Sequence, residues 1–134
     1  MITDLFDLGG KVALVTGANT GLGQAMAVAL AKAGANVALV GRSAPDETEA
    51  RINAVGGKTA VVMADLSEAG VVSEVVAQVE ESLGPVNILV NNAGIIRRED
   101  ALEFSEQDWD AVMATNLKVP FFLAQAVAKS MVEA

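Results

Sequence analysis

A glycine-rich turn between a short apolar segment and a helix-like segment is the feature that most constrains this chain. Lys11–Thr16 (KVALVT) is predicted to be a buried strand, and it runs directly into a turn with the spacing Gly-x-x-x-Gly-x-Gly. After the turn, apolar residues recur at helical spacing until Gly34, which is a typical helix stop. A strand, a tight glycine turn and a helix in this order favour the first unit of a parallel sheet. The residues that share one face of the predicted helix are Leu22, Ala25, Met26, Ala29, Leu30 and Ala33.

Strand-like and helix-like segments alternate along the rest of the chain. Three more strands are predicted at Asn36–Val40, Thr59–Met63 and Val86–Val90. Short connections between strands and helices predict right-handed crossovers and a parallel sheet. We therefore predict an α/β fold with a doubly wound, Rossmann-like sheet of strand order 3-2-1-4, forming one dinucleotide-binding domain over residues 1–134. The predicted helices run from about Pro45 to Gly56-Gly57, from a cap at Ser67 to Gly84-Pro85, and from a cap at Ser105 towards Ala134.

Composition removes several classes of function. The 134 residues include 9 Lys+Arg and 17 Asp+Glu, which gives a net charge of −8 and argues against nucleic-acid binding. The chain has no Cys and no His, so disulfides, Cys/His metal sites and His-dependent nucleophiles are excluded, and no metal site is expected. No uninterrupted apolar run approaches the roughly 18 residues typical of a membrane-spanning helix, and Asp4 and Asp7 are unlike a secretory signal. A cytoplasmic protein is therefore expected.

The glycine turn is suited to binding phosphate groups. Glycines permit the sharp turn, let a pyrophosphate approach the backbone without a Cβ in the way, and allow the helix to pack closely on the strand. The start of the helix then offers unpaired N–H groups to anions. A purely structural glycine-rich turn is the alternative, but the flanking strand and helix favour a dinucleotide site. The predicted cofactor-binding residues in this turn are Gly17, Asn19, Thr20, Gly21, Leu22 and Gly23.

Three further motifs follow the turn in a recognisable order. Asp65-Leu66 ends the third predicted strand, Asn91–Gly94 (NNAG) follows the fourth, and Asn116 lies within the last helix. With the glycine turn, they resemble the N-terminal half of the short-chain dehydrogenase/reductase family. The resemblance implies that Asp65 and Leu66 contact the adenine, and that Asn92, Ala93 and Gly94 contribute to the cofactor site, whereas Asn91 joins neighbouring backbone. Otherwise Asp65 could help to cap the next helix, and the asparagines could be ordinary turn residues.

The residues that follow the second strand bear on the choice between NAD and NADP. An NAD enzyme usually places a carboxylate there for the ribose 2′-OH, whereas NADP enzymes place a cation near the 2′-phosphate. Here the strand is followed by Arg42 and Ser43, and no carboxylate comes before Asp46. Arg42 and Ser43 could hold a phosphate, which favours NADP. The alternative is that Arg42 is a solvated loop residue or stacks on the adenine. The stretch from Ile95 to Trp109 resembles the 2-deoxy-D-gluconate 3-dehydrogenases, which commonly use NAD, so the cofactor is left as NAD or NADP and the expected substrate is a sugar acid.

Asn116 is the one catalytic residue that the resemblance assigns within this chain. Trp109, Val112, Met113 and Asn116 share a helical face that is expected to be buried. Pro120 has no N–H to donate to the Asn116 carbonyl, so this carbonyl should be free and the helix should kink. In the family, the corresponding carbonyl holds a water of the proton relay.

The family's proton-transfer groups have no counterpart in these residues. The family uses a Tyr-x-x-x-Lys motif on a fifth helix, whereas this chain contains no Tyr and stops before the fifth strand. We therefore expect an NAD(P)-dependent oxidoreductase by resemblance, with no appreciable turnover from the 134 residues alone. The alternative is a truncated, non-catalytic dinucleotide-binding or interaction protein. The exposed edge of the fourth strand and the apolar last helix, which packs between subunits in the family, suggest a homo-oligomer.

Overall fold

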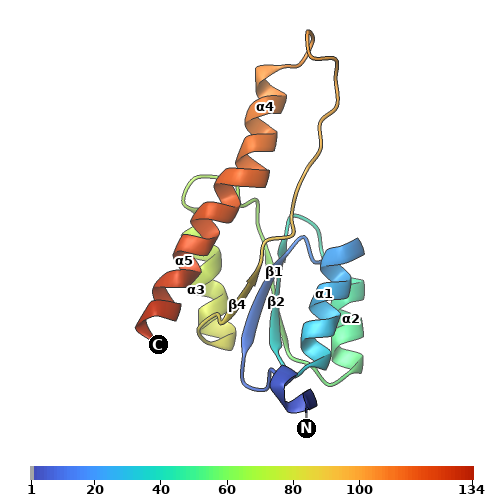
Figure 1. Ribbon diagram of the computed structural model, residues 1–134, viewed down its shortest axis with the longest axis vertical. Helices are drawn as coiled ribbons and strands as arrows, with labels where there is room; N and C mark the ends of the chain where they lie inside the picture. The colour runs from blue at the N-terminus through green and yellow to red at the C-terminus, as the bar shows by residue number, and fades with distance from the viewer. Residues whose placement is uncertain (1) are drawn as a thin grey trace.

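The computed structural model describes residues 2–134 and contains one parallel sheet of order β3-β2-β1-β4 (Figure 1). This arrangement confirms the predicted α/β class and strand order. The strands are β1 (Val12–Thr16), β2 (Asn36–Gly41), β3 (Thr59–Met63) and β4 (Ile88–Val90). The helical elements are η1 (Ile2–Phe6), α1 (Gly21–Lys32), α2 (Asp46–Ala54), α3 (Val71–Leu83), α4 (Glu106–Met113), η2 (Ala114–Lys118) and α5 (Val119–Glu133).

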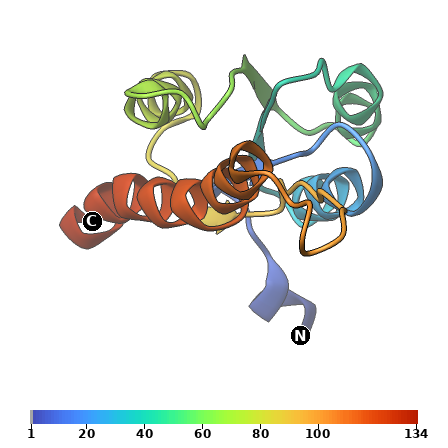
Figure 2. The same ribbon diagram turned by 90° about the horizontal axis from the view of Figure 1, so that it is seen from above.

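Helices cover both faces of the sheet. Figure 2 shows α1 and α2 on one side and α3 and α5 on the other. Successive residues of β1 contribute to opposite cores: Ala13 and Val15 pack with α1 and α2, whereas Val12 and Leu14 pack with α3 and α5. Burial on both faces explains why the strands are apolar throughout and do not alternate with polar residues.

The fourth strand begins two residues later than predicted, because Asn87 pairs with β1 through its side chain. Asn87 Oδ1 accepts a hydrogen bond from the Val12 N–H at 2.8 Å, and the Asn87 N–H donates to the Val12 carbonyl at 2.8 Å. Asn87 thus forms hydrogen bonds with both the N–H and the carbonyl of Val12, and regular strand geometry begins only at Ile88. A side chain that replaces a ladder hydrogen bond cannot be recognised from apolar periodicity.

The apolar face predicted for α1 is not the buried one. Leu22 is 78% exposed, and the buried positions of the helix are Gly23, Gln24, Ala27 and Ala31. Small residues face the sheet because the helix lies close to it, and Gly23 leaves no room for a side chain at the point of contact. Leu22 consequently lies on the outer side of the helix, and Val28 and Leu30 pack only partly buried at the edge of the core. Periodicity therefore identified the helix but selected the wrong face.

Ser67 does not cap α3, contrary to expectation. The helix begins at Val71, after Gly70, whose φ of 79° lies in the left-handed region. Ser67 instead belongs to a turn in which its N–H and hydroxyl both donate to Asp65 Oδ1, at 3.0 and 2.6 Å. The serine therefore contributes to the loop at the end of β3, where it lines the candidate site.

The elements α4, η2 and α5 form one continuous helical rod that extends beyond the sheet (Figure 1). Ser105 caps it as predicted, because its Oγ accepts a hydrogen bond from the Asp108 N–H at 3.1 Å. Only the α5 part has buried side chains, so the prediction of a buried face from Trp109 to Asn116 is wrong: Trp109 is 59% exposed, and Asn116 is also exposed. The projecting half of the rod consists of α4 and η2, and no described helix or strand covers its apolar face.

By length and composition, the rod is long and apolar enough to cross a membrane, and no other helix among residues 2–134 meets this criterion. Charged and polar residues interrupt the apolar residues of the rod, so its length and mean hydropathy meet the criterion without an uninterrupted apolar run. Leu123 and Val127 on this rod are buried in the core that α5 shares with α3, which is the ordinary position of a helix packed against a sheet. Val119 is also buried.

Candidate functional site

A cavity of about 360 Å³ lies at the carboxyl ends of the strands. It is lined by residues from the glycine turn, from the ends of β2 and β3, from the segment after β4, and from the rod. The cavity includes the carboxyl ends of the paired strands β1 and β4, where the strand order reverses, and open α/β sheets bind ligands at such points. The predicted cofactor residues that line the cavity are Gly17, Asn19, Thr20, Arg42, Ser43, Asp65, Leu66, Asn92, Ala93 and Gly94.

Three residues of the predicted turn do not line this cavity: Gly21, Leu22 and Gly23. Gly17 and Gly21 have φ values of 62° and 58°, a conformation that favours glycine. Gly23 is required for a different reason, because a Cβ at this position would lie 2.1 Å from the Gly17 carbonyl oxygen and 2.5 Å from Asn92 Nδ2. The last glycine of the motif therefore lets α1 begin directly against the turn and the segment after β4.

Thr16, the last residue of β1, holds the segment after β4 in place. Its Oγ1 accepts hydrogen bonds from the N–H groups of Asn92 and Ala93 at 3.0 and 2.9 Å, and donates to the Val90 carbonyl at 3.4 Å. Thr16 is 2% exposed, and its hydrogen bonds are partly buried at the edge of the cavity. Thr16 was not among the predicted site residues, although a polar residue at the end of an otherwise apolar strand is a usable signal.

The two asparagines after β4 have different partners. Asn92 Nδ2 donates to the carbonyls of Thr16 and Gly17, at 3.2 and 3.1 Å, and thereby joins the segment after β4 to the glycine turn. Asn91 Nδ2 donates to the Pro120 carbonyl at 3.4 Å, so it joins neighbouring backbone as expected. Asn92 lines the cavity, but the side-chain nitrogen is already engaged by the protein. A cofactor contact by its side chain would thus have to use the amide oxygen.

One cation lies opposite a carboxylate at the outer end of the cavity. Arg42 Nη1 is 3.6 Å from Asp65 Oδ2, and both side chains are in contact with solvent. Hydrogen bonds from the hydroxyl and N–H of Ser67 lower the pKa of Asp65, and the Arg42 charge acts in the same direction. Because the folded pKa is lowered, the stabilisation that Asp65 provides is present above its ordinary pKa and decreases as the pH falls through the folded value. Asp65 is therefore ionised at neutral pH and orients the turn after β3.

Asn116 is placed beside the cavity by a π-helical turn. Its amide forms two hydrogen bonds with one residue: Oδ1 accepts from the Ile95 N–H and Nδ2 donates to the Ile95 carbonyl, both at 2.9 Å. Asn116 lies in η2, where the Val119 N–H donates to the Ala114 carbonyl five residues earlier. The sequence predicted a kink and a free Asn116 carbonyl next to Pro120. The structure has a π turn directly before Pro120, within a continuous rod, and the free carbonyl stays a prediction. Asn116 does not line the cavity, whereas its partner Ile95 does.

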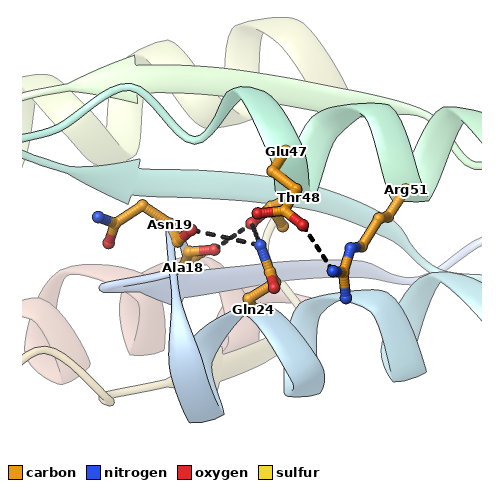
Figure 3. A network of polar contacts seen from close by, with 6 residues as sticks. All are labelled: Ala18, Asn19, Gln24, Glu47, Thr48 and Arg51. Atoms are coloured by element: carbon orange, nitrogen blue, oxygen red, sulfur yellow. Dashed lines mark hydrogen bonds and ion pairs between the residues drawn. The ribbon is translucent and has the colours of Figure 1, made fainter.

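Two buried polar side chains lie behind the glycine turn (Figure 3). Thr48 of α2 donates from Oγ1 to the Ala18 carbonyl at 2.6 Å. Gln24 of α1 donates from Nε2 to Thr48 Oγ1 at 3.0 Å and to the Asn19 carbonyl at 3.3 Å. Neither residue was predicted to belong to the site, because an isolated Gln or Thr in a predicted helix is usually solvated and nothing in its spacing indicates burial.

The chain is similar to dehydrogenases over nearly its whole length. A family model described as short chain dehydrogenase matches residues 11–134. The 2-dehydro-3-deoxy-D-gluconate 5-dehydrogenase of Dickeya dadantii is 49% identical over 133 residues, which are 99% of this chain and 53% of that protein. The gluconate 5-dehydrogenase of Gluconobacter oxydans is 45% identical and matches 96% of this chain and 51% of that protein.

Solved structures give the same result. A crystal structure of a provisionally assigned 2-deoxy-D-gluconate 3-dehydrogenase from Agrobacterium tumefaciens, with bound NADP, has a TM-score of 0.83 and 50% identity. It covers 96% of this chain, and the match covers 50% of that protein. A short-chain dehydrogenase/reductase from Mycobacterium marinum has a TM-score of 0.94 and 37% identity, covering 99% and 55% of the two chains. The chain thus spans about half the length of the relatives that it matches.

Proposed function

Because this chain belongs to the short chain dehydrogenase family, we propose that it forms the dinucleotide-binding part of an NAD(P)-dependent oxidoreductase. The observation that carries the proposal is the cavity at the carboxyl ends of the strands, which brings together the glycine turn, the ends of β2 and β3, and the segment after β4. Its volume of about 360 Å³ is within the usual range for small-molecule sites. When bound, the dinucleotide would supply hydride transfer between its nicotinamide and a substrate carbon.

The chain's own residues would bind and orient this cofactor. The N-terminus of α1 presents backbone N–H groups and the positive end of a helix dipole, both of which favour phosphate. Thr20, the residue before α1, makes no side-chain capping hydrogen bond, so its hydroxyl is available to a ligand. Arg42 and Ser43 line the cavity beyond the end of β2, where they would meet the ribose and its 2′-phosphate. Asp65 and Leu66 would lie along the adenine.

Arg42→Ala is expected to weaken NADPH binding about tenfold and to leave NADH binding within about twofold, because a hydrogen bond between charged groups is worth about 1.5–3 kcal/mol. The measurement is a fluorescence titration of the purified protein with each reduced dinucleotide. Arg51→Ala is the matched control, since Arg51 is also an exposed arginine in an ion pair, with Glu47 on α2 at 2.6 Å, and does not line the cavity. Equal or tighter binding of NADH by the wild type would contradict the assignment of Arg42 to a phosphate.

The proposed substrate class is a sugar acid, since two of the curated relatives act, by name, on gluconate or a deoxygluconate derivative. We further propose that Asn116 takes part in proton relay through its main-chain carbonyl. The π turn and the absence of an N–H on Pro120 support this role, and the bonds to Ile95 fix the helix next to the cavity. The relatives are dehydrogenases, which favours an oxidoreductase over a dinucleotide-binding protein without catalysis.

The purified 134-residue chain is expected to bind dinucleotide without measurable turnover of deoxygluconate or gluconate. The sequence contains no Tyr, so these residues offer no phenol for general acid–base catalysis, which contributes roughly 10²–10⁴-fold to rates. The measurement is NAD(P)H absorbance at saturating cofactor, with a full-length relative as the positive control. Steady production of NAD(P)H by this chain would show that another of its groups transfers the proton.

We also propose that the projecting half of the rod contacts a second copy of the protein. Large apolar side chains on this half are exposed in the described part of the chain, and such a surface is unusual for a monomer. On the projecting half the exposed large side chains are Trp109, Met113 and Leu117, and the exposed Phe121 and Phe122 follow at the start of α5.

A further inference from the structure

Thr48 and Gln24 fix the direction of two peptide groups in the glycine turn. Thr48 is fully buried and Gln24 is 9% exposed, yet neither lines the cavity. Their hydrogen bonds hold the carbonyls of Ala18 and Asn19 towards the interior between α1 and α2 (Figure 3). In a trans peptide the C=O and the following N–H point in opposite directions. The N–H groups of Asn19 and Thr20 are therefore turned away from α2.

Asn19 and Thr20 both line the cavity, whereas the network lies on the other side of their backbone. We propose that Thr48 and Gln24 are positioning residues, which keep the Asn19 and Thr20 N–H groups directed at phosphate oxygens of the bound dinucleotide. The inference rests on the dinucleotide site proposed above and assigns a role to α2, whose residues do not line the cavity.

The network also connects two parts of the site that are distant in sequence. Arg42 and Ser43 line the cavity just before α2, and Thr48 lies in the first turn of this helix. Through Thr48, the segment that follows β2 and the turn that follows β1 are held at a fixed separation. Thr48 Oγ1 both donates to the Ala18 carbonyl and accepts from Gln24, so removal of one hydroxyl releases both contacts.

Thr48→Val keeps the shape of the side chain and removes the hydroxyl. We expect the Kd for NADPH to rise about tenfold, because the buried Ala18 carbonyl loses its donor and the turn can rotate. Thr48→Ser keeps the hydroxyl and should bind within about twofold of wild type. The second measurement is the ¹H–¹⁵N spectrum: addition of NADP should shift the Asn19 and Thr20 amide signals in the wild type, and much less in Thr48→Val.

Thr59→Val is the matched control, because the Thr59 hydroxyl also bonds to α2, through Glu49 Oε2 at 3.0 Å, without touching the turn. The positioning role is wrong if Thr48→Val and Thr59→Val weaken NADPH binding equally. It is also wrong if Thr48→Val binds NADPH with the wild-type Kd and its Asn19 and Thr20 amide signals shift as in the wild type. Should Thr48→Val fail to fold, Gln24→Met tests the positioning role at the neighbouring carbonyl of Asn19, which Gln24 holds, and it should likewise weaken NADPH binding and reduce the shift of the Thr20 amide signal. A wild type that binds neither dinucleotide would instead overturn the proposed function itself.

Discussion

Gly23→Ala is expected to abolish measurable dinucleotide binding and to lower the free energy of unfolding by about 1–3 kcal/mol, the usual range for overpacking. The added methyl group would lie 2.1 Å from the Gly17 carbonyl oxygen and 2.5 Å from Asn92 Nδ2. The first of these is backbone, and Asn92 is held by two hydrogen bonds, so neither neighbour can move without displacing the turn. The measurements are urea unfolding, followed by titration with NADPH.

Gly21→Ala is the control within the same turn. A Cβ at Gly21 meets no heavy atom within 4 Å, although its φ of 58° imposes a strain of about 1–2 kcal/mol on any other residue. We therefore expect Gly21→Ala to lose stability without a steric displacement of Asn92, and to retain more dinucleotide affinity than Gly23→Ala. Binding by Gly23→Ala within about twofold of wild type would show that the contact between α1 and the turn is not needed for the site.

Thr16→Val is expected to destabilise the protein by about 1–3 kcal/mol, the usual cost of one buried polar group left without a partner. The substitution preserves volume but leaves the Ala93 N–H without its acceptor, whereas the Asn92 N–H keeps its hydrogen bond to the Val90 carbonyl at 3.0 Å. The segment after β4 would then move away from the glycine turn, and we expect the Kd for NADPH to rise more than tenfold. Urea unfolding and NADPH titration measure the two effects separately.

Thr16→Ser provides the matching control, since it retains the oxygen that accepts both hydrogen bonds. We expect it to unfold within about 1 kcal/mol of the wild type, the loss being that of one buried methyl group. If Thr16→Val and Thr16→Ser are equally stable, the Thr16 hydroxyl is not what holds the segment after β4.

The strands and their order were predictable because apolar runs of the right length have few alternatives in a parallel sheet. Helix positions were also predictable, but not always the face that each helix buries. In α1 the close approach to the sheet selects small residues such as Ala27 for the interior, and apolar periodicity gives more weight to the large ones. In α4, Trp109 lies on an apolar stripe that no described element covers, so periodicity alone indicated burial wrongly.

The positions of the motifs along the chain were enough to predict most of the residues that line the cavity. Asn19, Arg42, Asp65 and Asn92 each follow a strand, and parallel strands bring their carboxyl ends to one edge. The partners of these residues were not predictable in the same way. That Asn92 bonds to the Gly17 carbonyl depends on the distance between β1 and β4, which no local pattern encodes.

The sequence by itself determined the fold class, the strand order and the family, because apolar runs, glycine positions and short motifs act locally and in a fixed order along the chain. Only the tertiary structure decided how the site is held together. Thr16, Gln24 and Thr48 act through hydrogen bonds between segments 5 to 77 residues apart, and their burial arises only when the helices pack on the sheet. Apolar periodicity does not indicate whether an isolated polar side chain is buried. Inside the protein such a side chain needs a hydrogen-bond partner, and that requirement fixes the geometry of the turn.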